Sequence, residues 1–233
     1  MQFSELTLEK IILEVRYGIS YLFWDNSGKV MMQISAKYPQ FELRDAKLSN
    51  VQSDWWSEGI VLSFSHEKAD VTQDYPANLD TFKGVCGVLC DTLRSAFEVR
   101  TFTRVGVRYI FILPTKSREE ARDLVSKMAL LSVKAERLRP FGNGKVEEQQ
   151  VLIRYEDDDR GFLFRIGQIQ REPQLKIARP FVVDTGKFTQ NAILFDVDCY
   201  TRKPLDPPIF MPSDFIRVTH KTVESSLLPL LGL

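Results

Sequence analysis

The chain has 233 residues, 44% of them hydrophobic and 27% charged, which is typical of a soluble globular protein with one large domain or two small ones. Its 31 basic and 31 acidic residues cancel, whereas a protein dominated by nucleic-acid contacts usually has a basic excess. The three cysteines lack the spacing of a disulfide scaffold, and no apolar run approaches the roughly 20 residues of a membrane span. The N-terminus lacks the basic and apolar regions of a signal peptide, so we expect a cytoplasmic protein.

The first predicted unit is a strand followed by a helix. Residues 11–17 alternate between apolar and charged side chains, which predicts a β-strand with Glu14 and Arg16 on its polar face. Apolar side chains then recur at helical spacing. They predict a helix that starts at the turn-forming residues 25–28 and ends before Pro39.

The next segment predicts two antiparallel strands and the most regular helix of the chain. The strands cover residues 56–64 and 69–73, with Trp56 on the core face and Trp55 exposed. The helix covers residues 79–98, where apolar side chains at steps of three and four form one stripe: Leu79, Phe82, Cys86, Leu89, Leu93 and Phe97. We expect this stripe to pack against an antiparallel sheet that includes the first predicted strand.

The strand at residues 104–113 is the most informative segment of the chain. Its apolar face carries β-branched and aromatic residues, and Arg104, Gly106 and Arg108 lie on the opposite face. Pro114 has no amide proton and therefore ends the strand. Two guanidinium groups on one face of a strand predict either nearby carboxylates or an anionic ligand.

After this strand the sequence predicts a helix, a hairpin, another strand and a last helix. A capping box at Ser117–Glu120 starts the first of these helices, and the hairpin turns at Asp157–Gly161. Residues 193–199 alternate and form a strand with Asp196 and Asp198 on its polar face.

Together these elements predict an α+β fold in which one or more antiparallel sheets are covered by helices. The loop at residues 134–145 contains a proline and a glycine-rich turn. It is the best candidate boundary between an N-terminal α+β half, residues 1–133, and a C-terminal half, residues 134–233. We expect both halves to pack as one compact unit. Similar helix starts at residues 80–82 and 213–215 are compatible with two related halves.

Three predicted strands share a charged face, and its six charged residues are the candidate binding residues: Glu14, Arg16, Arg104, Arg108, Asp196 and Asp198. Three acidic and three basic side chains favour a solvated ladder of salt bridges, in which Arg104 or Arg108 pairs with a carboxylate. The alternative is a polar cleft in which the arginines hold a carboxylate or phosphate group, with Gly106 leaving room for the ligand.

Recognisable catalytic motifs are absent, since the sequence has no Walker loop, Rossmann glycine pattern, nucleophile elbow or HExxH motif. The spacing of Asp196 and Asp198 could suit a metal ion, but many surface strands share it. Cys86 and Cys90 share a helix face, yet two cysteines alone do not complete a zinc site. We therefore predict no cofactor and no metal, and we lean towards a protein that is not an enzyme.

Another protein is the expected partner, because a sequence without catalytic motifs and without net charge favours an interface over a catalytic pocket. Aromatic and arginine side chains are enriched where proteins dock. The candidate partner surface joins Trp55 to Arg137, Arg139 and Phe141 of the loop. Association with a second copy of the chain is compatible with such a surface. Basic residues in the same loop leave nucleic-acid contact as a minor alternative.

Three short segments carry a family resemblance: Leu13–Tyr17 (LEVRY), Arg104–Tyr109 (RVGVRY) and Leu194–Asp198 (LFDVD). Together with the Tyr38–Pro39 pair, they make the chain similar to a family of uncharacterised prokaryotic proteins that are sporadically distributed among genomes. The chain departs from the family at Phe111, where an asparagine often stands, and residues 115–190 give little to align.

The leading interpretation is a cytosolic protein that binds another protein. The resemblance alone implies that it is encoded in an accessory, defence-type or toxin–antitoxin-like locus. The alternative function is a small-anion or nucleotide sensor, or an enzyme, that uses the charged face of the sheet. Because the family has no established activity, the resemblance implies no catalytic residues.

Overall fold

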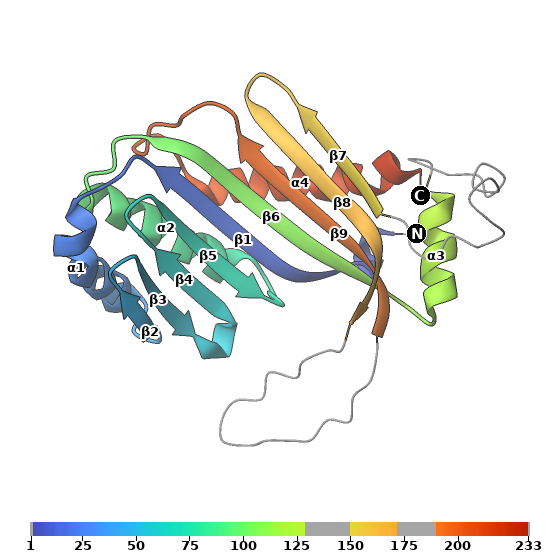
Figure 1. Ribbon diagram of the computed structural model, residues 1–233, viewed down its shortest axis with the longest axis horizontal. Helices are drawn as coiled ribbons and strands as arrows, with labels where there is room; N and C mark the ends of the chain where they lie inside the picture. Colours follow the sequence, from blue (N-terminus) through green and yellow to red (C-terminus); the bar gives the residue numbers. More distant parts are fainter. Residues whose placement is uncertain (1, 129–149, 172–189, 233) are drawn as a thin grey trace, which may run out of the picture.

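The computed structural model describes residues 2–128, 150–171 and 190–232, which form one sheet with helices packed on it (Figure 1). The strands are β1 (Thr7–Tyr17), β2 (Glu42–Lys47), β3 (Asn50–Trp55), β4 (Ile60–Phe64), β5 (Lys68–Asp74), β6 (Phe102–Thr115), β7 (Gln150–Glu156), β8 (Arg160–Arg171) and β9 (Gln190–Thr201). The α-helices are α1 (Leu22–Lys37), α2 (Asp80–Ala96), α3 (Arg118–Lys127) and α4 (Pro212–Leu231). None of the helices within these ranges is long and apolar enough to cross a membrane.

All nine described strands belong to one antiparallel sheet with the order β2-β3-β4-β5-β1-β6-β9-β8-β7. The long strands β1 and β6 lie side by side in the middle and pair from Thr7 with Ile112 to Tyr17 with Phe102. The protein therefore has an α+β fold in which helices cover an antiparallel sheet, and the predicted fold class is confirmed.

The chain passes through the sheet in the same way twice. After β1 come α1, a run of strands from the edge strand β2 inward to β5 beside β1, and then α2. After β6 come α3, a run of described strands from the edge strand β7 inward to β9 beside β6, and then α4. The repeated order begins again at β6. The boundary predicted at residues 133 and 134, like the loop at residues 134–145, lies outside the described residues.

The predicted stripe of α2 is buried. Phe82, Cys86, Leu89 and Leu93 are all 0% exposed, and α2 contacts α1 on one side and α4 on the other. Figure 1 shows α2 and α4 behind the sheet, whereas α3 stands at the end where it contacts β6, β8 and β9. The hydroxyl of Tyr109 donates a hydrogen bond to a backbone oxygen of α4, which ties the apolar face of β6 to this helix.

The structure reverses the predicted positions of the two tryptophans. Trp55 is half-buried, and its ring lies 5.8 Å from that of Tyr38 and 5.7 Å from that of Phe41. Trp56 is 67% exposed, because it starts a 3₁₀ turn, Trp56–Glu58, between β3 and β4. This turn breaks the period-two count, so the alternation of β4 does not extend back to Trp56.

Candidate functional site: the charged face of the sheet

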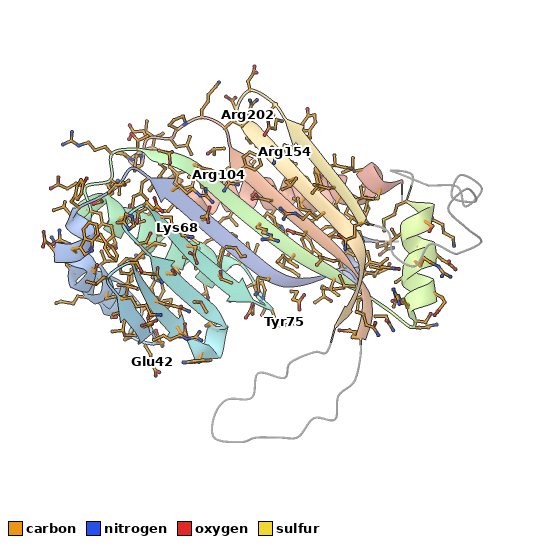
Figure 2. All side chains as sticks on the ribbon, viewed as in Figure 1. Glu42, Lys68, Tyr75, Arg104, Arg154 and Arg202 are labelled. Carbon is orange, nitrogen blue, oxygen red and sulfur yellow. The ribbon has the colours of Figure 1, made fainter. Side chains whose placement is uncertain are left out.

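The strand register brings the predicted binding residues together on the face opposite α2 and α4. Glu14 of β1 pairs with Gly106 of β6, and Arg108 of β6 pairs with Asp198 of β9. In Figure 2, Arg104 is labelled near the middle of this face. We call this surface the charged face and define it by Glu14, Arg16, Arg104, Arg108, Arg165, Asp196 and Asp198.

Asp196 is the most enclosed carboxylate of the charged face. It is 3% exposed, and both of its oxygens accept hydrogen bonds from Arg108, over 2.6 Å each. Arg165 of β8 donates a third hydrogen bond to Asp196 over 3.0 Å. The hydrogen bonds between Arg108 and Asp196 raise the pKa of Arg108 above its ordinary value, although burial acts in the opposite direction. The Arg108–Asp196 contact is therefore a bidentate pair of the strong type.

Arg104 is held between the two neighbouring strands. It donates to Glu14 of β1 over 3.2 Å and to Asp198 of β9 over 3.0 Å. Its guanidinium also lies 4.8 Å from the ring centre of Tyr200, which adds a cation–π contact. Glu14 accepts a second hydrogen bond, from Arg16, over 2.7 Å. The prediction that Arg104 or Arg108 pairs with one of these carboxylates is confirmed, and both arginines do so.

The space above Gly106 is filled by protein rather than open to a ligand. A Cβ atom at this position would lie 3.3 Å from a carboxylate oxygen of Asp198 and 3.4 Å from a guanidinium nitrogen of Arg104. The first distance is tight for a carbon atom and the second is an ordinary van der Waals contact, so glycine lets the Arg104 guanidinium and the Asp198 carboxylate lie close over the strand. The prediction that Gly106 leaves room for a ligand is therefore wrong.

Asp70 is a further carboxylate beside the charged face. It lies on β5 directly across from Glu14, and it makes no ion pair with another described residue. Burial raises the pKa of Asp70 to about 6; the charge of Glu14 adds to this shift, and that of Lys68 opposes it. Within the charged face itself, burial likewise raises the pKa of Asp198, against the opposing effect of Arg104. Asp70 therefore titrates closer to neutral pH than an ordinary aspartate.

Two members of this surface region, Arg165 and Asp70, do not follow from motif reading. Both occupy the polar position of a strand, so alternation alone indicates which face they share. Their neighbours depend on the order of the strands, with β8 beside β9 and β5 beside β1, and no local pattern fixes that order.

The predicted partner surface is described only in part. Trp55 packs into the aromatic cluster with Tyr38 and Phe41 and is half-buried, which leaves little of its ring for a partner. The other three residues of that surface lie outside the described residues: Arg137, Arg139 and Phe141. Tyr21 and Trp24, at 77% and 49% exposure, are better exposed aromatic residues that the sequence reading does not single out.

The charged face consists of carboxylate and guanidinium groups that are paired with one another. Within the described ranges, no group of three or more histidine, cysteine, aspartate or glutamate side chains is placed to hold a metal ion. Burial raises the pKa of the Cys90 thiol to about 12 and raises that of Cys86 well above its usual value, so neither is an activated nucleophile. Asp196 and Asp198 are both engaged with arginines.

Comparison of the chain with models of known protein families finds no match, and comparison with curated proteins finds no similar sequence.

Proposed function

We propose that this protein acts by binding another protein through the charged face of its sheet. The observation that carries the proposal is that three arginines of this face stay accessible to solvent although they are paired with carboxylates. Arg108, Arg165 and Arg16 are 40%, 46% and 54% exposed at their side chains, although each is already paired with a carboxylate. They come from three different strands, so the accessible charge is spread over a broad surface rather than gathered in one pocket.

A small anion is a weaker candidate ligand for this face. A phosphate or carboxylate would have to compete with Asp196 for Arg108, whose two hydrogen bonds to that carboxylate are short and bidentate. Displacing Asp196 would leave a carboxylate that is 3% exposed without its counter-charge. An anion that binds Arg104 would likewise have to compete with Glu14 and Asp198, the two carboxylates that Arg104 already bridges.

A protein partner suits this network of ion pairs better than a small anion does. The ion pairs hold the long arginine side chains in place, so less side-chain entropy is lost when a partner covers them. Alternating charges also favour a partner with the matching pattern and disfavour others, because like charges brought together are costly. The network thus supports selective recognition of a protein surface of mixed charge.

The family resemblance adds support of a second kind. Its three segments contain six of the seven residues that define the charged face, from Glu14 and Arg16 to Asp196 and Asp198. The segments by which the chain resembles the sporadic prokaryotic family therefore converge on one surface. A cytosolic accessory protein from a defence-type or toxin–antitoxin-like locus is part of this proposal.

The test compares a face variant with a matched control. Arg16→Ala/Arg165→Ala removes two exposed guanidinium groups, while Glu14 and Asp196 keep Arg104 and Arg108 as partners. Arg217→Ala/Lys221→Ala removes the same charge from the outer surface of α4. Each tagged protein is expressed in its native host, and the proteins that co-purify are quantified by mass spectrometry.

We expect a specific partner to co-purify with the wild-type protein and the α4 variant and to fall by about tenfold with the face variant. Melting temperatures of all three proteins check that the fold is intact. The same partner profile for the face variant and the wild type would reject the charged face as the binding surface.

A further inference from the structure

Two adjacent cavities lie at the end of the sheet where β1 ends and β6 begins. The first, of about 480 Å³, is lined by the loop that joins β1 to α1 and by the loop that joins α2 to β6. The second, of about 410 Å³, is lined by the end of α2 and by the loop between β9 and α4. The two cavities share Glu98, Val99 and Arg100 as lining residues, and we call them together the loop groove.

Glu98 lines both cavities and has an unfavourable backbone conformation. Its φ angle is +52°, in the left-handed region that side chains other than glycine rarely adopt. Glu98 follows Phe97, the last residue that caps α2, and so occupies the first position past the helix end. Glycine usually occupies this position. A glutamate at this position strains the backbone, which points to a role for its side chain in the two cavities that it lines.

The charged side chains of the groove are available to a ligand. Glu98 and Arg100 are exposed, and neither makes an ion pair with another residue in the described ranges. This contrasts with Arg94 of the same groove, which pairs with Asp91 over 3.3 Å. The groove therefore presents two carboxylates, Glu98 and Asp206, and one guanidinium group, Arg100, that make no ion pair with another described residue.

Apolar side chains form the rim of the first cavity. Ile19 and Tyr21 are 59% and 77% exposed and line it directly. The ring of Trp24 lies 6.2 Å from that of Tyr21, and its indole N–H donates to the backbone oxygen of Leu48 over 3.1 Å. Exposed aromatic residues held in place beside a groove are typical anchors of protein interfaces.

We propose that the loop groove binds an extended segment of a partner protein. In this arrangement an apolar side chain of the segment covers Ile19 and Tyr21, an acidic side chain pairs with Arg100, and a basic group pairs with Glu98. The groove crosses three loops, which suits an extended chain better than a compact small molecule. The proposal relies on the proposed function only for the class of partner, because none of the residues that define the charged face lines the loop groove.

The experiment selects the segment directly. A phage-displayed library of random peptides is panned on the full-length protein, and a synthetic peptide of the recovered consensus is titrated by fluorescence anisotropy. We expect a consensus that combines an apolar, an acidic and a basic residue. Its Kd should rise about tenfold or more for Arg100→Ala and for Glu98→Gly, and stay unchanged for Arg16→Ala/Arg165→Ala.

Glu98→Gly separates loss of binding from loss of folding. Glycine adopts a positive φ freely, so this variant should melt about 2–4 °C above the wild type while it binds the peptide more weakly. Failure to recover a consensus, or equal affinity of the wild type, Glu98→Gly and Arg100→Ala, would overturn the proposal. So would a homodimer that Tyr21→Ser dissociates in sedimentation runs, since a second copy would then occupy the groove. Loss of peptide binding only in the face variant would refute the groove and leave the proposed function standing.

Discussion

Single carboxylates of the charged face serve more than one arginine. Asp196 accepts hydrogen bonds from Arg108 and Arg165, and Glu14 accepts them from Arg16 and Arg104. Because each shared carboxylate neutralises two guanidinium groups, the network should tolerate the loss of one exposed arginine better than the loss of a shared carboxylate.

Asp196→Asn tests this dependence. The substitution keeps the shape of the side chain but removes the charge that two arginines share, and it should lower the free energy of unfolding by about 2–3 kcal/mol. This is less than the roughly 3–5 kcal/mol of a fully buried pair, because Arg108 and Arg165 are 40% and 46% exposed. Urea denaturation at neutral pH measures the difference.

Asp214→Asn is the control for that measurement. Asp214 pairs with Arg217 on α4 over 3.0 Å, and both side chains are more than 60% exposed, at 62% and 64%. Exposed pairs contribute about 0–1 kcal/mol, so this variant should unfold close to the wild type. Similar losses for the two variants would show that Asp196 has no special place in the network.

Asp70 gives the stability a defined pH dependence. Its pKa in the folded protein is about 6, above the value of about 3.9 expected in the unfolded chain. The folded state therefore holds this proton more tightly, and the associated stability is fully present below about pH 4 and lost as the pH rises through 6. At pH 7 the folded protein bears the cost of an ionised, half-buried carboxylate.

Asp70→Asn should remove that cost. We expect the variant to be more stable than the wild type by about 1–2 kcal/mol at pH 7 and nearly equal to it at pH 4. The full shift would correspond to about 3 kcal/mol, and partial exposure of the side chain reduces it. Urea midpoints of both proteins between these pH values provide the test, and a constant difference across the range would contradict the assignment.

Among the elements, α2 contains two glycines with different surroundings. A Cβ atom at Gly84 would lie 2.6 Å from the hydroxyl of Tyr38, whereas a Cβ atom at Gly87 meets nothing within 4 Å. Gly84 therefore allows the close approach of Tyr38, at the end of α1, and Gly87 serves no such contact.

Gly87→Ala should therefore stabilise the protein by about 0.5–1 kcal/mol, because alanine restricts the unfolded chain and favours the helix. Gly84→Ala provides the matched comparison. It gains the same helix propensity but must displace the Tyr38 hydroxyl, so its stability should be lower than that of Gly87→Ala. Thermal unfolding of the two variants distinguishes them, and equal melting temperatures would refute the role of the Tyr38 contact.

The elements that can be predicted from the sequence are those with one buried and one exposed face. β1, β6 and β9 alternate clearly, and α2 has a single stripe, so their faces follow from periodicity. β2 contains no buried residue, which leaves no alternation by which to recognise it. The parity of the strands places Arg104, Asp196 and Asp198 on one face, but their pairing depends on β9 lying beside β6. That neighbourhood is a property of the whole fold.

At the scale of the whole molecule, several contacts join the two runs of the chain that repeat the same order. β1 and β6 pair along the middle of the sheet, and α2 contacts α4 across the same boundary. On the charged face, Arg104 of β6 bonds to Glu14 of β1. Since the core and the sheet both continue across this junction, we expect the two runs to fold as one cooperative unit rather than as independent domains.

Two core variants, one in each run, test this cooperativity. Ile34 of α1 is 0% exposed and Val223 of α4 is 3% exposed, so Ile34→Ala and Val223→Ala each leave a cavity in the core. Differential scanning calorimetry should show one transition in the wild type, with equal calorimetric and van't Hoff enthalpies. Each variant should lower that same transition, by roughly 5–10 °C for Ile34→Ala and by less for Val223→Ala, which loses a smaller side chain. Two resolved transitions, each lowered by only one of the variants, would show instead that the halves unfold separately and that the β1–β6 junction is a docking contact between domains.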